Sequence, residues 1–125
     1  MLSRRRGPTA YATGLAAEDT ACAALRTDGW TILGRRLRTA AGEVDAVAEK
    51  AGLLALIEVK HRKSLAEAAA ALTARQRSRL LGACDIILAK HPDWGTNGVR
   101  FDVLLVDPAG QVRRITDAFR LGDQG

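Results

Sequence analysis

The segment LLALIEVKHRK, residues 53–63, constrains the fold of this chain more than any other segment. Five apolar residues at its start predict a buried strand, and Glu58 and Lys60 then interrupt the apolar run. Burial of a carboxylate or an ammonium group costs free energy unless the group is paired, hydrogen-bonded or bound to a metal ion. Either the strand ends before Glu58 and both charges are solvated, or the chain places them there for chemistry.

The alternation of side chains along this segment predicts what covers it. A strand repeats every two residues, so Leu54 and Leu56 share a face with Glu58 and Lys60. The opposite face is also apolar and carries Leu53, Ala55, Ile57 and Val59. A strand that is apolar on both faces is typical of the centre of a sheet with helices on both sides.

The whole chain predicts one α/β domain, residues 14–120, with a central mixed sheet of about five strands flanked by helices. Strands are expected at residues 30–38, 43–49, 53–60, 99–106 and 111–119. Helices are expected at residues 14–28, 65–72 and 73–90, with Thr73 as the N-cap of the last. The expected order is α-β-β-β-α-β-β, preceded by a flexible basic arm (residues 1–13) and followed by a tail (residues 121–125).

Length and composition limit the classes of protein. The chain has 125 residues, of which 47% are apolar, as in an ordinary globular domain. No run approaches the roughly 20 apolar residues of a transmembrane helix, and no apolar segment follows the basic cluster at the start, so we expect neither a membrane nor a secretory protein. Cys22 and Cys84 fall within helical apolar patterns, which indicates buried thiols in a reducing cytoplasm.

The charge balance leaves two interpretations open. The net charge is +5, from 19 basic and 14 acidic residues, and 15 of the basic residues are arginines. Such an excess fits a nucleic-acid partner, because the guanidinium fork matches phosphate oxygens. A composition rich in alanine and arginine can equally reflect coding bias.

Three acidic residues lie where a carboxylate needs an explanation. Glu18 falls in the apolar stripe of the first helix, Asp45 lies on the strand before the central one, and Glu58 ends the central strand. Strands of a hairpin lie about 4.8 Å apart, so Asp45 and Glu58 can face each other. Two carboxylates that close stay ionised only with a cation between them, and hard oxygen ligands suit Mg²⁺ or Mn²⁺. Lys60 can orient water there or neutralise charge on a phosphoryl group.

This pattern, an acidic residue followed twelve residues later by Glu-x-Lys, resembles the PD-(D/E)xK nuclease superfamily. A more specific resemblance comes from motifs along the chain: G-x₃-E (residues 14–18), GEVD (42–45), IEVKHR (57–62), RQRSRL (75–80) and RFDVLLV (100–106). Together they resemble the YraN-like family of small bacterial proteins, over residues 10–120. The resemblance implies a restriction-endonuclease-like fold, near that of archaeal Holliday-junction resolvases, and a metal-dependent nuclease acting on branched or single-stranded DNA. Because resolvases act as dimers, it also implies a homodimer.

The resemblance assigns roles residue by residue. Asp45 and Glu58 would bind Mg²⁺ or Mn²⁺, Lys60 would be the catalytic lysine, and Glu18 an additional catalytic carboxylate. Val44 stands where the superfamily motif has proline, and Arg75 stands where the family is expected to favour lysine. Contacts to nucleic acid are expected from a further set: Gln76, Arg62, Arg75, Arg79 and Arg100.

Structural interpretations of the same residues stay open at this point. Glu58 and Lys60 can be a surface ion pair at a strand end, Asp45 can belong to a solvated face, and Glu18 can be bonded to a neighbouring arginine. Arg100 and Asp102 share a strand face and can form a structural pair with those carboxylates. The alternative function is a nucleic-acid-binding module of the same fold that needs no catalysis.

Overall fold

The structure, a computed structural model, describes residues 6–119, with side chains from residue 14 onward. Residues 1–5 of the expected arm and the expected tail, residues 121–125, lie outside this range. One sheet holds five strands in the order β1-β2-β3-β4-β5. Their bounds are β1 Thr31–Thr39, β2 Gly42–Lys50, β3 Leu53–His61, β4 Val99–Val106 and β5 Val112–Ile115.

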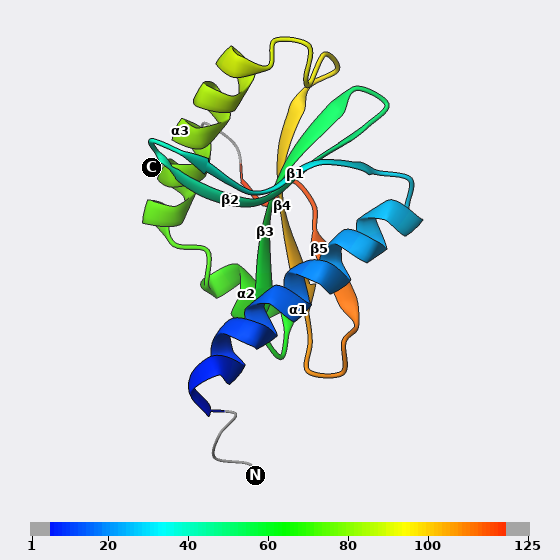
Figure 1. Cartoon of the computed structure of the whole chain (residues 1–125), viewed down its shortest axis with the longest axis vertical. Helices are drawn as coiled ribbons and strands as arrows, with labels where there is room; N and C mark the ends of the chain where they lie inside the picture. Colours follow the sequence, from blue (N-terminus) through cyan, green and yellow to red (C-terminus); the bar gives the residue numbers. More distant parts are fainter. Residues whose placement is uncertain (1–5, 120–125) are drawn as a thin grey trace.

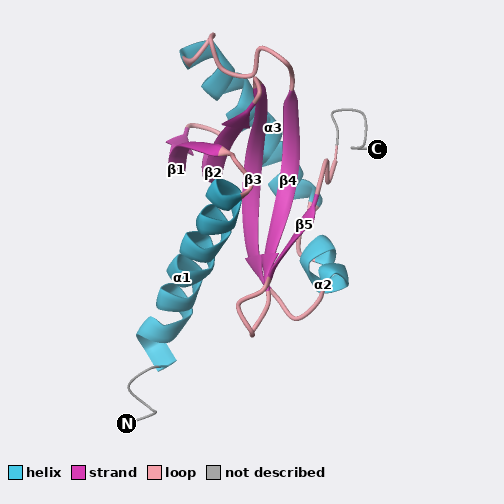
Figure 2. Ribbon diagram, turned by 90° about the vertical axis from the view of Figure 1, so that its right-hand side faces the viewer, coloured by secondary structure: helices cyan, strands magenta, loops and turns pink. Residues whose placement is uncertain are grey.

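Helices cover both faces of this sheet (Figures 1 and 2). Helix α1 (Arg6–Thr27) packs on one face, and α3 (Ala74–Lys90), preceded by the short α2 (Leu65–Ala70), packs on the other. Strands β3 and β4 are parallel, and the other neighbouring pairs are antiparallel. The predicted single α/β domain with a mixed five-stranded sheet is therefore confirmed. No helix in the described range is long and apolar enough to cross a bilayer.

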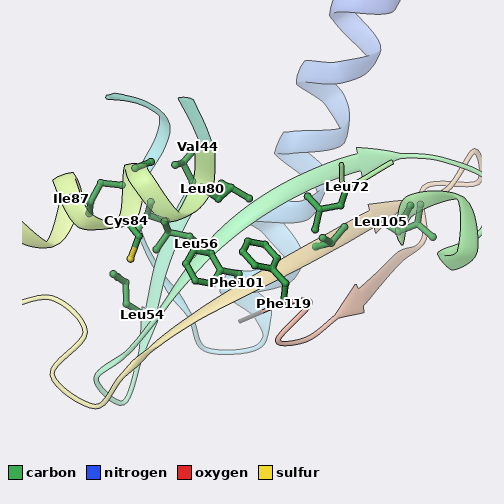
Figure 3. Close-up of a cluster of buried hydrophobic side chains, with 14 residues drawn as sticks. Val44, Leu54, Leu56, Leu72, Leu80, Cys84, Ile87, Phe101, Leu105 and Phe119 are labelled. Atoms are coloured by element: carbon green, nitrogen blue, oxygen red, sulfur yellow. The ribbon is translucent and has the colours of Figure 1, made fainter. Parts of the chain in front are cut away.

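Strand β3 divides two apolar cores, as its alternation predicts. Leu54 and Leu56 face α3 and pack with Leu80 in the core shown in Figure 3. Ala55 and Ile57 face α1 and belong to the second core. Each fully buried leucine side chain stabilises the fold by about 2 kcal/mol. Glu58 and Lys60, at the charged end of β3, therefore lie on the same face as Leu54 and Leu56, which are buried in the core beneath α3.

Helix α1 begins at Arg6, eight residues before the expected helix start at residue 14. Pro8 permits this early start, because the first four N–H groups of a helix have no intrahelical partner and proline lacks only such a group. The helix ends at Thr27, one residue before the expected end, and Gly29 follows it. Gly29 has φ of 90° and donates to the carbonyl of Arg26, while Trp30 donates to that of Leu25, which together form a Schellman motif.

Strand β2 departs from the expected alternation at its start. A regular strand alternation would place Val44 on the face of Ala46 and Ala48, but Val44 lies with Val47 in the core beneath α3, while the two alanines belong to the core beneath α1. The ladder between β2 and β3 has its last pair at Ala46 and Ile57. The segment of β2 before Ala46 has left β3, so it can turn Val44 toward α3.

Strand β5 is shorter than the expected residues 111–119. Asp117 has φ of 54°, a left-handed conformation that interrupts an extended strand, and Ala118 donates its N–H to the carbonyl of Phe101 at 2.7 Å. Phe119 then stacks on Phe101 with ring centroids 4.6 Å apart (Figure 3). The end of the predicted strand therefore closes the core on the α3 side instead of extending the sheet.

Candidate functional site

Glu58 is a buried carboxylate whose two oxygens have different surroundings. Its side chain is 7% exposed. Oε2 accepts a hydrogen bond of 2.7 Å from Nη2 of Arg79, and Nζ of Lys60 lies 3.8 Å from the same oxygen. Oε1 is buried and has no hydrogen-bond partner in the described part of the chain. The interpretation as a solvated pair at a strand end is therefore wrong, because β3 continues to His61 with both charged side chains largely covered.

The pKa of Glu58 reports this environment. It is raised from 4.5 to about 7, first by burial and then by the negative charge of Asp45. The positive charges of Arg79 and Lys60 act in the opposite direction, as does the hydrogen bond from Arg79. Near neutral pH this carboxyl group therefore stands close to the midpoint of its titration.

Asp45 lies where β2 and β3 separate, on the antiparallel neighbour of the strand that carries Glu58. Its Oδ2 accepts a hydrogen bond of 2.8 Å from the backbone N–H of Val59. The carboxylate thus accepts from an N–H of β3 that a backbone carbonyl of β2 would bind if the ladder continued past its last pair, Ala46 and Ile57. Because its charge raises the pKa of both Glu58 and Glu18, Asp45 interacts electrostatically with both carboxylates.

Glu18 approaches from the other side of the sheet, on α1. Its side chain is 12% exposed, and its Oε1 lies 3.9 Å from both Nη2 of Arg35 and Nε of Arg36. At these distances the arginines form ion pairs with Glu18 but no hydrogen bonds. Oε1 is a buried atom without a hydrogen-bond partner in the described range. Burial raises the pKa of Glu18, the charge of Asp45 raises it further, and the two arginines lower it.

The donor set fits a hard divalent cation in its chemistry. Glu58 and Glu18 each present a buried oxygen that lacks a hydrogen bond, and Asp45 adds a third carboxylate nearby. Within the described residues, however, no three histidine, cysteine, aspartate or glutamate side chains are close enough together to hold a metal ion by themselves. Mg²⁺ is commonly bound by one or two carboxylates, with waters and substrate phosphates completing its shell. Asp45 and Glu58 would supply the two carboxylates of such a site.

Helix α3 supplies three of the residues expected to contact nucleic acid, and they have different surroundings. Arg79 points to Glu58 and is engaged there. Gln76 forms a capping box with Thr73: its side chain accepts from the Thr73 N–H, and its own N–H donates to the Thr73 hydroxyl. Arg75 is exposed. Of the three, only Arg79 is thus brought to the carboxylates by a contact, and the sequence gives no signal for this contact between residues 21 positions apart.

The other two expected contacts lie outside this cluster. Arg62 is exposed after the end of β3, and its guanidinium donates to the carbonyl of His61. Arg100 pairs with Asp102 through two hydrogen bonds of 2.9 and 2.8 Å and lies 5.5 Å from the ring of Trp30. Trp30 belongs to the core on the α1 side, so Arg100 forms a structural pair on the face opposite to Glu58.

Comparison with known proteins shows that the site residues lie in the part of the chain that matches a protein family. A model described as Uncharacterised protein family UPF0102 matches residues 17–106, a span that includes every carboxylate discussed above and Lys60. The chain is 62% identical over 120 residues to a UPF0102 protein of Granulibacter bethesdensis, covering 96% of this chain and 76% of that relative. It is 48% identical over 119 residues to a UPF0102 protein of Azorhizobium caulinodans, covering 95% and 91% of the two chains. A UPF0102 protein of Rhodopseudomonas palustris is 46% identical over 110 residues, which cover 88% of this chain and 85% of that one.

Proposed function

The chain belongs to the UPF0102 family, the YraN-like family that its motifs resemble, and from this premise we propose that it is a metal-dependent nuclease that hydrolyses phosphodiester bonds in DNA. The observation that carries the proposal is Glu58, a carboxylate held in the interior with one oxygen unpartnered beside a second carboxylate and a lysine. A purely structural strand end has no need of that arrangement, because burial of ionisable groups is costly.

The proposed roles follow from the positions of the side chains. Asp45 and Glu58 would hold Mg²⁺ or Mn²⁺, which when bound supplies positive charge to the phosphoryl oxygens. Lys60, 3.8 Å from Glu58, places an ammonium at the same point and stabilises negative charge that develops on the phosphate. Glu18, whose pKa is raised by burial, can hold a proton on the α1 side of the site.

A nucleic-acid-binding module without catalysis is the second candidate. It is favoured by the ion pairs of Glu58, which Arg79 and Lys60 partly neutralise without any metal ion. Against it stand the three carboxylates, which repel the phosphates that a basic binding surface would attract. The two candidates differ in one measurable property, the dependence of cleavage on a divalent cation.

A cleavage panel tests the proposal. Linear, flapped, nicked and four-way DNA, together with RNA, are incubated with Mg²⁺, Mn²⁺ or EDTA. We expect cleavage of at least one DNA with a divalent cation and none in EDTA. Glu58→Gln and Asp45→Asn are expected to abolish cleavage while the protein stays folded, and Asp85→Asn, an exposed carboxylate on α3, serves as the matched control.

A negative panel is informative when it is combined with a binding measurement. If the wild type cleaves nothing and Mn²⁺ leaves its melting temperature unchanged, the binding module becomes the better description, because a cation that binds the folded state must stabilise it. The proposal also places the protein in the cytoplasm, with the DNA, as a homodimer. Light scattering in solution tests the dimer directly.

A further inference from the structure

The contact between Arg79 and Glu58 is one-sided. The arginine reaches from α3 to Oε2 at 2.7 Å, and Lys60 approaches the same oxygen at 3.8 Å. Oε1 receives no hydrogen bond from the described residues although it is buried. A carboxylate held through one oxygen has a fixed orientation, and its other oxygen remains available as a ligand.

The path of Arg79 is confined by the turn between β1 and β2, which Figure 1 shows reaching toward α3. A Cβ atom at Gly42 would clash with both Cγ and Cδ of Arg79, so the arginine stem passes where any other residue would have a side chain. One turn further along α3, a Cβ at Gly82 would lie 3.0 Å from that of Ala41. The turn therefore packs closely on the helix at two successive positions.

The burial of one guanidinium nitrogen, Nε, is consistent with this confinement. Nε of Arg79 is buried and has no hydrogen-bond partner in the described part of the chain, although 31% of the side chain is exposed. A mobile surface arginine would turn this donor to water, because an unsatisfied buried N–H is costly. Arg79 instead keeps the conformation that joins Nη2 to Glu58.

We propose, on the premise of the nuclease function above, that Arg79 is a positioning residue for metal binding, with Gly42 providing its path. Arg79 holds Oε2 of Glu58 so that Oε1 is presented to the divalent cation. This role differs from the phosphate contact that the sequence suggests for Arg79. It also differs from that of a counter-ion that leaves when the metal binds, because the close packing at Gly42 keeps the stem in place.

The affinity for Mn²⁺ distinguishes these roles, and Gly42→Ala is the sharpest variant because it changes no charge. Displacing the arginine should weaken Mn²⁺ binding at least tenfold if Arg79 positions Glu58. If Arg79 only competes with the metal, the same substitution should strengthen binding. Titration calorimetry with Mn²⁺ alone measures the difference, and Lys90→Ala, which removes an exposed cation from the same helix, is the control.

Gly42 has φ of 138°, so alanine there is also strained for reasons unrelated to Arg79. A double-mutant cycle separates the two effects. In an Arg79→Ala background the stem is absent, and Gly42→Ala should then change Mn²⁺ affinity by less than twofold, although the backbone strain persists. An equal loss in both backgrounds would overturn the positioning role.

Arg79→Lys provides a second variant that keeps the charge but not the guanidinium fork. We expect it to lower kcat at least tenfold, to leave DNA affinity in EDTA unchanged and to weaken Mn²⁺ binding. Lost DNA affinity with normal Mn²⁺ binding would instead identify a phosphate contact and overturn the inference. A wild type that binds no Mn²⁺ overturns the nuclease proposal itself, whereas Mn²⁺ binding that is unaffected by Gly42→Ala overturns only the role of Arg79.

Discussion

At Glu58, burial and charge are opposed within a single side chain. Burial and Asp45 favour the protonated form, while Arg79 and Lys60 favour the ionised form, and the resulting pKa is about 7. An ordinary glutamate in the unfolded chain titrates near 4.5. The folded state therefore binds a proton at Glu58 more tightly than the unfolded state does, and the stability of the metal-free protein must depend on pH.

The sign of this dependence gives the first prediction. The stabilisation that comes from proton binding at Glu58 is fully present below pH 4.5 and is lost as the pH rises through 7. In EDTA the free energy of unfolding should therefore fall by up to about 3 kcal/mol across that interval. Glu58→Gln should remove this dependence and be more stable than the wild type at pH 8. Urea unfolding at pH 5 and pH 8 in EDTA measures both effects. A wild type whose pH dependence is unchanged by the substitution would assign it to other groups.

Lys60 gives a prediction that separates chemistry from metal binding. An ammonium is not a metal ligand, so Lys60→Ala should leave Mn²⁺ affinity largely intact while it lowers the cleavage rate on the order of 100-fold. Lys63→Ala, the removal of an exposed lysine three residues further on, should cleave like the wild type. Single-turnover cleavage at saturating Mn²⁺ gives the rates. Parallel losses of Mn²⁺ affinity and rate would show that Lys60 acts through Glu58 instead.

The sequence identifies Asp45, Glu58 and Lys60 as candidates because the spacing of a hairpin and the alternation of a strand are local properties. The structure confirms the strand neighbours and the shared face of Glu58 and Lys60. The partnership with Arg79 could not be predicted, since it depends on how the β1–β2 turn packs on α3. Long-range contacts of this kind leave no periodic signal in the chain.

At the scale of elements, strong local patterns predicted most of the sheet. β4 has the expected bounds, because turn residues stand on both sides of it: Gly98 precedes the strand and Asp107-Pro108 follow it. β5 was predicted too long, since the segment after Asp117 leaves the strand: Ala118 bonds to the backbone of Phe101, and Phe119 packs on its ring. The early start of α1 was not predicted, since residues 1–13 were expected to form a basic arm.

The start of α3 gives a prediction at this scale. The hydroxyl of Thr73 accepts from the backbone N–H of Gln76, and the side chain of Gln76 accepts from the backbone N–H of Thr73. Two N–H groups at the helix start are therefore satisfied. Thr73→Ala should destabilise the protein by about 1 kcal/mol, while Ser78→Ala at an exposed position of the same helix should be nearly neutral. Urea midpoints measure the difference. Equal midpoints for the two variants would mean that water replaces the cap at no cost.

Over the whole molecule, the arginines fall into two groups, those paired with carboxylates and those exposed to solvent. Arg79 and Arg100 are bound to carboxylates on the α3 and α1 faces respectively, whereas Arg62 and Arg75 are exposed. The net charge of +5 is thus not uniformly available to a polyanion. Part of it stabilises buried acidic groups, and only the exposed part can release counterions from DNA.

This division predicts the salt dependence of DNA binding, measured in EDTA so that cleavage does not intervene. Log affinity should fall linearly with log salt, with a slope of about 0.9 for each phosphate neutralised on duplex DNA. Arg62→Ala and Arg75→Ala should each lower the slope by about one unit. Arg100→Ala should leave the slope unchanged and instead lower stability, because the buried Asp102 would lose its ion-pair partner and keep, among the described residues, only the hydrogen bond from the N–H of Asp117. Salt-insensitive binding, or none at low ionic strength, would exclude a nucleic-acid role, since any protein that neutralises phosphates must release counterions.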